Sequence, residues 1–170
     1  MARQRHLART DLLTGILNRR GFDEAMGREF ARAARRNEMT SLLLLDIDFF
    51  KGVNNRYGHQ VGVSVLAVVS ESIAAMLRTE GVFGRLGGEE FVVILPPIDH
   101  AQALDVAERL RGLVAALPID AADCQEHVMV SIGVACTDAD GADWDSLYRA
   151  ADQRLYDGKS SGRNKVQGRS

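Results

Sequence analysis

The spacing of hydrophobic and polar residues along the 170-residue chain predicts a protein that mixes helices and strands. Apolar residues recur at helical spacing in three long segments, near residues 19–36, 62–78 and 99–117. A last helix is expected to begin at Asp143 or Asp145 and to end near Gly158. Asn18 and Asp99 are expected N-caps, because their side chains can accept hydrogen bonds from the first helical N–H groups.

Four apolar runs predict strands, and a short helical or irregular segment follows the first run. The predicted strands are residues 42–48, 82–86, 91–95 and 128–136. The second and third runs flank a Gly-Gly pair, which favours a hairpin because glycine adopts positive φ without strain. Apolar and small or polar residues alternate in the fourth run, which predicts a half-buried strand.

The order of these elements predicts an α+β fold with a ferredoxin-like βαββαβ core and added terminal helices. A right-handed crossover makes the first two strands parallel. The third strand can then lie between them, antiparallel to both. This arrangement brings the end of the first strand and the Gly-Gly turn to the same edge of the sheet.

Carboxylates converge at that edge. Asp46 and Asp48 share one face of the first strand because the strand period is two, and Glu89 and Glu90 follow the Gly-Gly pair. Taken alone, such a turn is more often a solvated hairpin tip. Converging acids repel each other without a counterion, however, and this favours a divalent-metal site. Oxygen ligands without histidine or cysteine favour Mg²⁺ or Mn²⁺ over zinc.

Three basic residues flank the acidic edge and are candidate triphosphate ligands: Lys51, Lys159 and Arg163. Each one taken singly is more often a solvated surface cation. As a set around an acidic centre they suit metal-assisted nucleotidyl transfer, in which a 3′-hydroxyl is activated and pyrophosphate departs.

Composition and charge narrow the class of protein. A length of 170 residues and 46% hydrophobic composition predict one compact domain, over residues 11–170, after a basic connector at residues 1–10. The net charge of -2 gives no overall attraction to nucleic acid or an anionic membrane. Cys124 and Cys136 lack metal-ligand spacing and are expected to be reduced core residues. With no signal peptide and no apolar stretch near the length of a membrane span, a cytoplasmic domain is expected.

These motifs resemble the GGDEF family of diguanylate cyclases, in its GGEEF form. The resemblance covers nearly the whole chain and is carried by six motifs, at residues 11–20, 46–51, 54–59, 85–91, 131–135 and 151–164. It implies a nucleotidyl cyclase or palm-like fold. It also implies condensation of two GTP into cyclic di-GMP across an antiparallel homodimer, under the control of an upstream sensor domain.

The resemblance also implies roles for individual residues. Asp46 and Glu89 would bind Mg²⁺ or Mn²⁺ together with the carbonyl of Ile47, and Glu89 would help to deprotonate the 3′-hydroxyl. Glu90 would support the catalytic site, while Asp48 is a weaker ligand candidate.

The remaining implied roles concern the nucleotide. Phe49 and Phe50 would offer backbone amides to the phosphates, which Lys51, Lys159 and Arg163 would also hold. Asn54 would contact the guanine base.

One departure from the family pattern affects base recognition. Val63 stands where the family has an aspartate that accepts the N1 and amino hydrogens of guanine. Loss of a charge-assisted bond costs about 1.5 to 3 kcal/mol, or roughly ten- to 150-fold in affinity. Ser64 or an ordered water is the alternative acceptor. Three hypotheses follow: a cyclase with weakened guanine recognition, a degenerate nucleotide-binding module, or a cyclase that accepts ATP as well as GTP.

A second departure affects the inhibitory product site. Arg78 is present, but Gly81 occupies the position of the family aspartate, and Glu80 is one residue early. We therefore expect no tight product inhibition through this motif.

Overall fold

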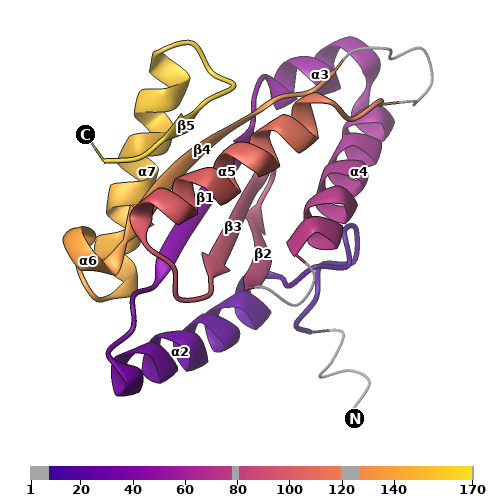
Figure 1. The fold of residues 1–170 in the computed structure, drawn as a ribbon. Helices are drawn as coiled ribbons and strands as arrows, with labels where there is room; N and C mark the ends of the chain where they lie inside the picture. The colour runs from indigo at the N-terminus through magenta and orange to yellow at the C-terminus, as the bar shows by residue number, and fades with distance from the viewer. Residues whose placement is uncertain (1–7, 78–80, 120–126, 170) are drawn as a thin grey trace.

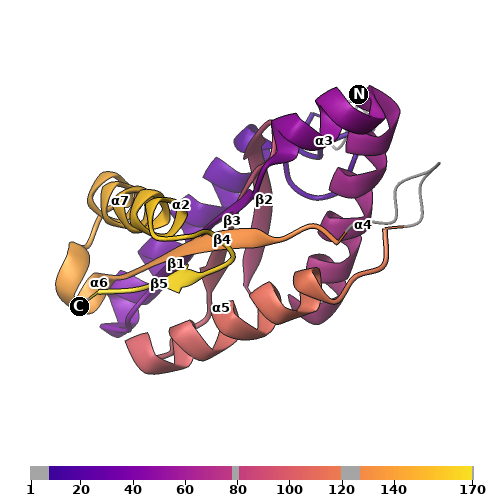
Figure 2. The same cartoon turned by 90° about the horizontal axis from the view of Figure 1, so that it is seen from above.

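The sheet in the computed structural model has five strands in the order β2-β3-β1-β4-β5, with helices on both faces (Figures 1 and 2). The structure describes residues 8–77, 81–119 and 127–169. The strands are β1 (Ser41–Ile47), β2 (Val82–Gly87), β3 (Glu90–Leu95), β4 (Val130–Cys136) and β5 (Val166–Gln167). The helices are α2 (Arg19–Arg36), α3 (Phe50–Tyr57), α4 (His59–Leu77), α5 (His100–Ala115), α6 (Thr137–Asp140) and α7 (Trp144–Ser160).

The predicted topology is confirmed. β3 lies between β2 and β1 and is antiparallel to both, and β4 is antiparallel to β1. The short strand β5, which the sequence pattern did not predict, pairs with β4 in parallel. The ends of β1 and of the β2–β3 hairpin therefore meet at one edge of the sheet.

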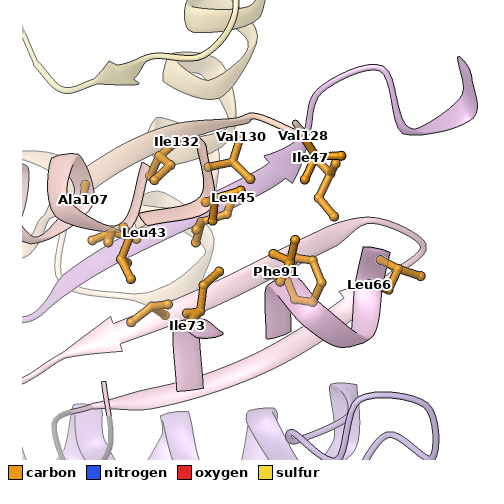
Figure 3. Close-up of a cluster of buried hydrophobic side chains, with 14 of the residues drawn as sticks. Leu43, Leu45, Ile47, Leu66, Ile73, Phe91, Ala107, Val128, Val130 and Ile132 are labelled. Carbon is orange, nitrogen blue, oxygen red and sulfur yellow. The ribbon is translucent and has the colours of Figure 1, made fainter. Parts of the chain in front are cut away.

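Two hydrophobic clusters cover the two faces of the sheet. Leu43, Leu45 and Ile47 of β1 face α4 and α5, among the side chains drawn in Figure 3. Leu42 and Leu44 point to the other face, toward α2 and α7. Alternate side chains of β1 therefore pack into the hydrophobic clusters on the two faces of the sheet, as the strand period of two requires.

The prediction that the fourth strand is half-buried is wrong. All seven residues of β4 are buried, because α5 covers one face and α7 the other. Small residues at Ser131, Gly133 and Ala135 resemble exposed positions by hydropathy, but they allow a helix to approach closely. An added Cβ at Gly133 would lie 2.0 Å from the carbonyl oxygen of Ala151 in α7.

The helix boundaries agree with the predicted caps. The side chain of Asn18 accepts from the N–H of Gly21 at 2.9 Å. Asp99 and Gln102 form a reciprocal capping box at the start of α5. Asp143, rather than Asp145, caps α7.

α4 begins at His59, three residues before the expected start at residue 62. Within the described ranges it is the helix whose length and apolar composition match a membrane span, so the expectation that no stretch approaches such a span needs correction. Length and composition are weak evidence, because buried core helices share them. Its apolar residues pack against the sheet, including Val65, Val69 and Ile73.

Part of the predicted connector is described. Arg9 forms an ion pair with Glu24, and Thr10 forms a bridge with Leu17. Residues 1–7 lie outside the described residues, as does Cys124. Cys136 is a buried free thiol, as expected.

Candidate active site

The Gly-Gly turn lies against the end of β1. The sheet register pairs Asp46 with Glu90, and the N–H of Ile47 donates to the carbonyl oxygen of Glu89 at 3.3 Å. Gly88 has a φ of 49°, and the space around its missing Cβ is open. The structure therefore brings Asp46, Glu89 and Glu90 together, as the topology predicted.

Arg85 links the Gly-Gly turn to Asp11, near the start of the described chain. Its Nε donates to the carbonyl oxygen of Gly88 at 2.9 Å, and its Nη1 lies 3.1 Å from Asp11. Asp11 also accepts from the N–H and the hydroxyl of Thr14. Burial raises the pKa of Asp11, but the Thr14 hydrogen bonds and the Arg85 charge outweigh it and lower the pKa overall.

Asp46 is a partly buried acid with one paired and one unpaired oxygen. Its Oδ2 lies 2.8 Å from the Nζ of Lys159 on α7, whereas its buried Oδ1 forms no hydrogen bond with any described residue. Burial raises the pKa of Asp46, and the charges of Glu89 and Asp48 add to this while Lys159 opposes it. Asp46 therefore has one oxygen in an ion pair with Lys159 and one oxygen without a partner among the described residues.

Glu90 is held by Tyr148, a residue that the sequence analysis did not single out. The Tyr148 hydroxyl donates to Oε1 of Glu90 at 3.1 Å. Burial raises the pKa of Glu90, and burial together with the Glu90 charge raises the pKa of Tyr148 to about 12. Tyr148 lies eleven residues before Lys159, about three helical turns, so both project from the same face of α7.

Asp48 lies beyond the end of β1 and is engaged elsewhere. Its Oδ1 accepts from the hydroxyl of Ser131, and its Oδ2 accepts from the backbone N–H of Asn164. This geometry therefore does not favour Asp48 as a metal ligand.

The expected phosphate-binding groups lie near the same edge. Phe49 adopts a left-handed conformation at the N-terminus of α3 and offers no side-chain cap to its first N–H groups. Lys51 is exposed on the first turn of α3. The guanidinium of Arg163 lies 4.4 Å from the centre of the Phe49 ring.

A divalent cation fits these donors. Asp46 Oδ1 is buried and unpaired, and the charge of Glu89 is close enough to raise the pKa of Asp46, so the donors that these residues offer are oxygens. The described residues contain no group of three or more His, Cys, Asp or Glu side chains poised for a metal. A site with two carboxylates suits Mg²⁺, which takes its other ligands from water and substrate phosphates.

Comparison with known proteins agrees with this geometry. The family model described as "Diguanylate cyclase, GGDEF domain" matches residues 8–165. The chain belongs to the GGDEF domain family. It is 41% identical over 165 residues to the response regulator PleD of Caulobacter vibrioides, covering 96% of this chain and 36% of that protein. It is 35% identical to the diguanylate cyclase DgcP of Pseudomonas aeruginosa, covering 96% of this chain and 24% of DgcP. The GGDEF chain thus spans about a third or less of the length of these relatives.

Solved GGDEF structures share the fold. The GGDEF domain of DgcB from Caulobacter crescentus, in complex with c-di-GMP, matches with a TM-score of 0.87 and 33% identity over 95% of each chain. The active GGEEF domain of a diguanylate cyclase from Vibrio cholerae matches with a TM-score of 0.83 and 32% identity, over 90% of this chain and 97% of that one. GGDEF cyclases use a divalent metal, in keeping with the oxygen donors at Asp46 and Glu89.

The residues expected to recognise the base lie where α3 meets α4. Asn54 is partly buried, and its Oδ1 has no hydrogen-bond partner among the described residues. The lack of a side chain at Gly62 leaves room for the Asn54 side chain, because an added Cβ at Gly62 would lie 1.7 Å from Asn54 Oδ1. Val63 is the next residue of α4, and the Ser64 hydroxyl donates to the carbonyl oxygen of Gln60 at 3.1 Å.

The incomplete inhibitory motif has a backbone basis at Gly81. Its φ is 99°, and an added Cβ would lie 2.4 Å from the carbonyl oxygen of Ile94. An aspartate would therefore be strained there. Arg78 lies outside the described residues.

A groove of about 660 Å³ between α4 and α5, lined in part by Pro96 and Arg109, lies at the opposite end of β3 from Glu89.

Proposed function

We propose that this GGDEF domain condenses two molecules of GTP into cyclic di-GMP and releases two pyrophosphates. The observation that carries the proposal is Asp46, whose buried Oδ1 lacks a partner beside the Glu89 turn while Lys159 contacts its other oxygen. A buried, unpaired carboxylate oxygen at this edge suits a metal-nucleotide site better than a solvated surface turn. In each half-reaction a 3′-hydroxyl attacks the α-phosphate of the other GTP and pyrophosphate leaves.

In this proposal Asp46, Glu89 and the Ile47 carbonyl hold Mg²⁺ or Mn²⁺. The bound ion lowers the pKa of the attacking hydroxyl and neutralises charge that develops on the phosphates. Glu89 accepts the proton of the 3′-hydroxyl. Glu90, held by Tyr148, keeps the turn in place and adds negative potential.

The phosphates are bound from two sides. The N–H groups of Phe49 and Phe50 and the ammonium of Lys51 approach from the start of α3, where the helix terminus favours anions. Lys159 and Arg163 approach from α7 and the loop that follows it. Lys159, which neutralises Asp46 in this structure, is near enough to serve a bound phosphate instead.

The base pocket supports a second candidate, a cyclase with weakened preference for guanine that also accepts ATP. Val63 cannot accept the hydrogens of guanine and does not repel the amino group of adenine. Asn54, with an unpaired Oδ1, stays available to either purine. A nucleotide-binding module without turnover is the other alternative.

The partners proposed are a second copy of the chain and an upstream sensor region. The relatives are about three times as long as this chain or longer, since the chain covers 36% of PleD and 24% of DgcP. One structural neighbour, the diguanylate cyclase SiaD, was solved in complex with its activator SiaC. Control of dimer formation by attached or bound partners fits the occurrence of GGDEF domains within longer chains such as PleD and DgcP.

The test supplies GTP, ATP or both with Mg²⁺ and separates the products by chromatography. We expect cyclic di-GMP from GTP alone, and mixed dinucleotides from the two substrates if base choice is relaxed. Absence of any cyclic dinucleotide, even with dimerisation enforced, would refute both enzyme proposals and favour the binding module.

The companion variant is Glu89→Gln, which keeps the shape of the side chain but removes its charge and its basicity. We expect product formation to fall at least about 100-fold, as is usual when an acid-base group is lost. Exposed Glu71→Gln on α4 is the matched control and should retain full activity. An unchanged rate for Glu89→Gln would contradict its proposed role.

A further inference from the structure

A buried carboxylate joins the first and last segments of the candidate active site. Asp48 is 5% exposed, and both of its oxygens are bonded within the protein. Oδ1 accepts from the Ser131 hydroxyl at 2.7 Å, and Oδ2 accepts from the N–H of Asn164 at 2.9 Å. Asp48 thus links the end of β1 to β4 and to the loop after α7.

That loop has a backbone conformation that needs support. Arg163 and Asn164 have φ values of 64° and 49°, in the left-handed region that non-glycine residues seldom adopt. Two such residues in succession persist only where surrounding contacts hold them. Besides Asp48, the contacts include Arg111 Nη1, which donates to Asn164 Oδ1 at 2.9 Å, and the N–H of Ile132, which donates to Lys165.

The supported conformation determines where Arg163 points. Its guanidinium stacks on Phe49, whose side chain is 67% exposed and therefore offers little support of its own. Phe49 follows Asp48 in the chain, and Asn164 follows Arg163. One carboxylate therefore controls the spacing between the phosphate-binding turn at the start of α3 and the arginine from the C-terminal loop.

We propose that Asp48 is a positioning residue that holds Arg163 over the phosphate-binding turn, with Arg111 as a second support through Asn164. The purpose of this arrangement, triphosphate binding by Arg163, rests on the proposed function. The attachment of the loop to Asp48 does not, and it can be measured without nucleotide.

A double-mutant cycle separates positioning from a general role in folding. The variants are Asp48→Asn, Arg163→Ala and their combination in the full chain. The probe is a GTP analogue with a methylene between the α and β phosphates, titrated in the presence of Mg²⁺. We expect Arg163→Ala to weaken binding by about ten- to 150-fold, the range for a charge-assisted bond, and Asp48→Asn to weaken it by less. The double variant should bind as Arg163→Ala does.

Multiplicative effects in the double variant would overturn the proposal, because Asp48 would then act independently of Arg163. If Asp48→Asn fails to fold, Arg111→Met provides the same cycle from the other support. Arg35→Met, at an exposed position of α2, is its matched control and should leave affinity unchanged. Asn164→Gly keeps the backbone N–H and the left-handed conformation, so its expected loss is smaller than that of Asp48→Asn.

Hydrogen–deuterium exchange of the nucleotide-free protein supplies the second measurement. We expect Asp48→Asn to speed exchange at residues 161–165 about tenfold or more while α4 and α5 keep their protection. Unchanged exchange in this loop would show that Asp48 does not hold it, whether or not the protein is a cyclase. A protein that binds the analogue and obeys the cycle but forms no cyclic dinucleotide would refute the proposed function alone.

Discussion

At the scale of single residues, two buried oxygens of the candidate site lack hydrogen-bond partners, as do the hydroxyls of Ser41 and Ser70 elsewhere in the described residues. Leaving a buried acceptor without a partner costs about 1 to 3 kcal/mol, so such atoms are rare in stable cores. Asp46 Oδ1 and Asn54 Oδ1 are both of this kind among the described residues. One lies at the predicted metal site and the other in the predicted base pocket, which are the places where a metal-nucleotide complex would supply partners.

Val63 allows the base-recognition argument to be tested with one substitution. Val63→Asp restores an acceptor for the N1 and amino hydrogens of guanine on the first turns of α4. We expect GTP affinity to rise roughly ten- to 150-fold, from a charge-assisted bond worth about 1.5 to 3 kcal/mol. Titration with GTP and ATP measures it, and ATP affinity should not rise.

Ser64→Ala is the partner experiment. If the Ser64 hydroxyl accepts from guanine in place of the missing aspartate, removal of that hydroxyl weakens GTP binding in the otherwise unchanged protein. The Ser64 hydroxyl donates to the Gln60 carbonyl oxygen but keeps lone pairs that can accept, so unchanged GTP affinity, which we expect, would exclude Ser64 as the acceptor. Equal GTP affinity of Val63→Asp and the unsubstituted protein would show that the pocket is assigned to the wrong residues.

At the scale of elements, α7 supplies the site with residues that no local pattern connects to β1. Lys159 reaches Asp46 and Tyr148 reaches Glu90 because α7 lies directly on β4 and β1. The close approach depends on Gly133, where an added Cβ would lie 2.0 Å from Ala151 and 2.6 Å from Leu155. The position of α7 therefore determines the electrostatics of the candidate site.

Gly133→Ala should separate α7 from the sheet. We expect the free energy of unfolding to fall by about 3 kcal/mol or more, at the upper end for overpacking, since the obstructing atoms are backbone. Urea denaturation measures this. Gly27→Ala, at an exposed α2 position with open space around it, is the control and should raise stability by about 0.5 to 1 kcal/mol. Equal stability of the two variants would contradict the close packing.

The ion pair of Asp140 and Arg154 joins α6 to α7 and predicts a pH effect. Both Asp140 oxygens lie 2.7 Å from the guanidinium of Arg154, which also donates to Val134. The Arg154 hydrogen bonds lower the pKa of Asp140 below its usual 3.8. The folded state therefore releases this proton more readily than the unfolded state. The stabilisation is present above about pH 4 and is lost as the pH falls through the folded-state pKa.

Asp140→Asn keeps the shape of the side chain and removes the charge. We expect it to lower the free energy of unfolding by about 1 to 3 kcal/mol at pH 7, with a difference from the unsubstituted protein that shrinks below pH 4. Thermal denaturation across pH 2.5 to 7, at roughly half-unit steps, follows this change. Asp23→Asn, in an exposed pair with Arg19, should change stability by less than about 0.5 kcal/mol. A constant difference down to low pH would contradict the assignment.

At the scale of the whole molecule, the described residues offer one set of proposed triphosphate-binding groups, whereas the proposed product joins two nucleotides. The described residues of each chain form a single sheet edge at which Asp46 pairs with Glu90. Catalysis by two apposed copies therefore requires association. Control of association by other parts of a longer protein fits the relatives, of which this chain covers 36% or less in PleD and DgcP.

This requirement predicts that the rate per chain depends on protein concentration. We expect specific activity to rise in proportion to concentration while the protein is mostly monomeric, and to level off once dimers dominate. Initial rates over a hundredfold range of concentration, together with sedimentation of the same samples, test it. Constant specific activity in samples shown to be monomeric would contradict a two-copy active site.

The sequence by itself determined the long helices, the first four strands, their order and the convergence of Asp46 with Glu89, but not β5 or α6. Residue periodicity identifies helices and strands, and crossover handedness leaves few topologies open. Side-chain identity also determined that position 63 lacks an acceptor, since valine has none in any fold.

Only the tertiary structure decided which element covers each inward face and which distant groups meet. Local periodicity shows that a residue points inward but not what it touches, and so Ser131 and Gly133 suggested a half-exposed strand that α7 covers completely. For the same reason the second acid of the first strand, Asp48, looked like a neighbour of the metal site. The approach of a loop 116 residues away, which no local pattern encodes, gave that acid its partner in Asn164.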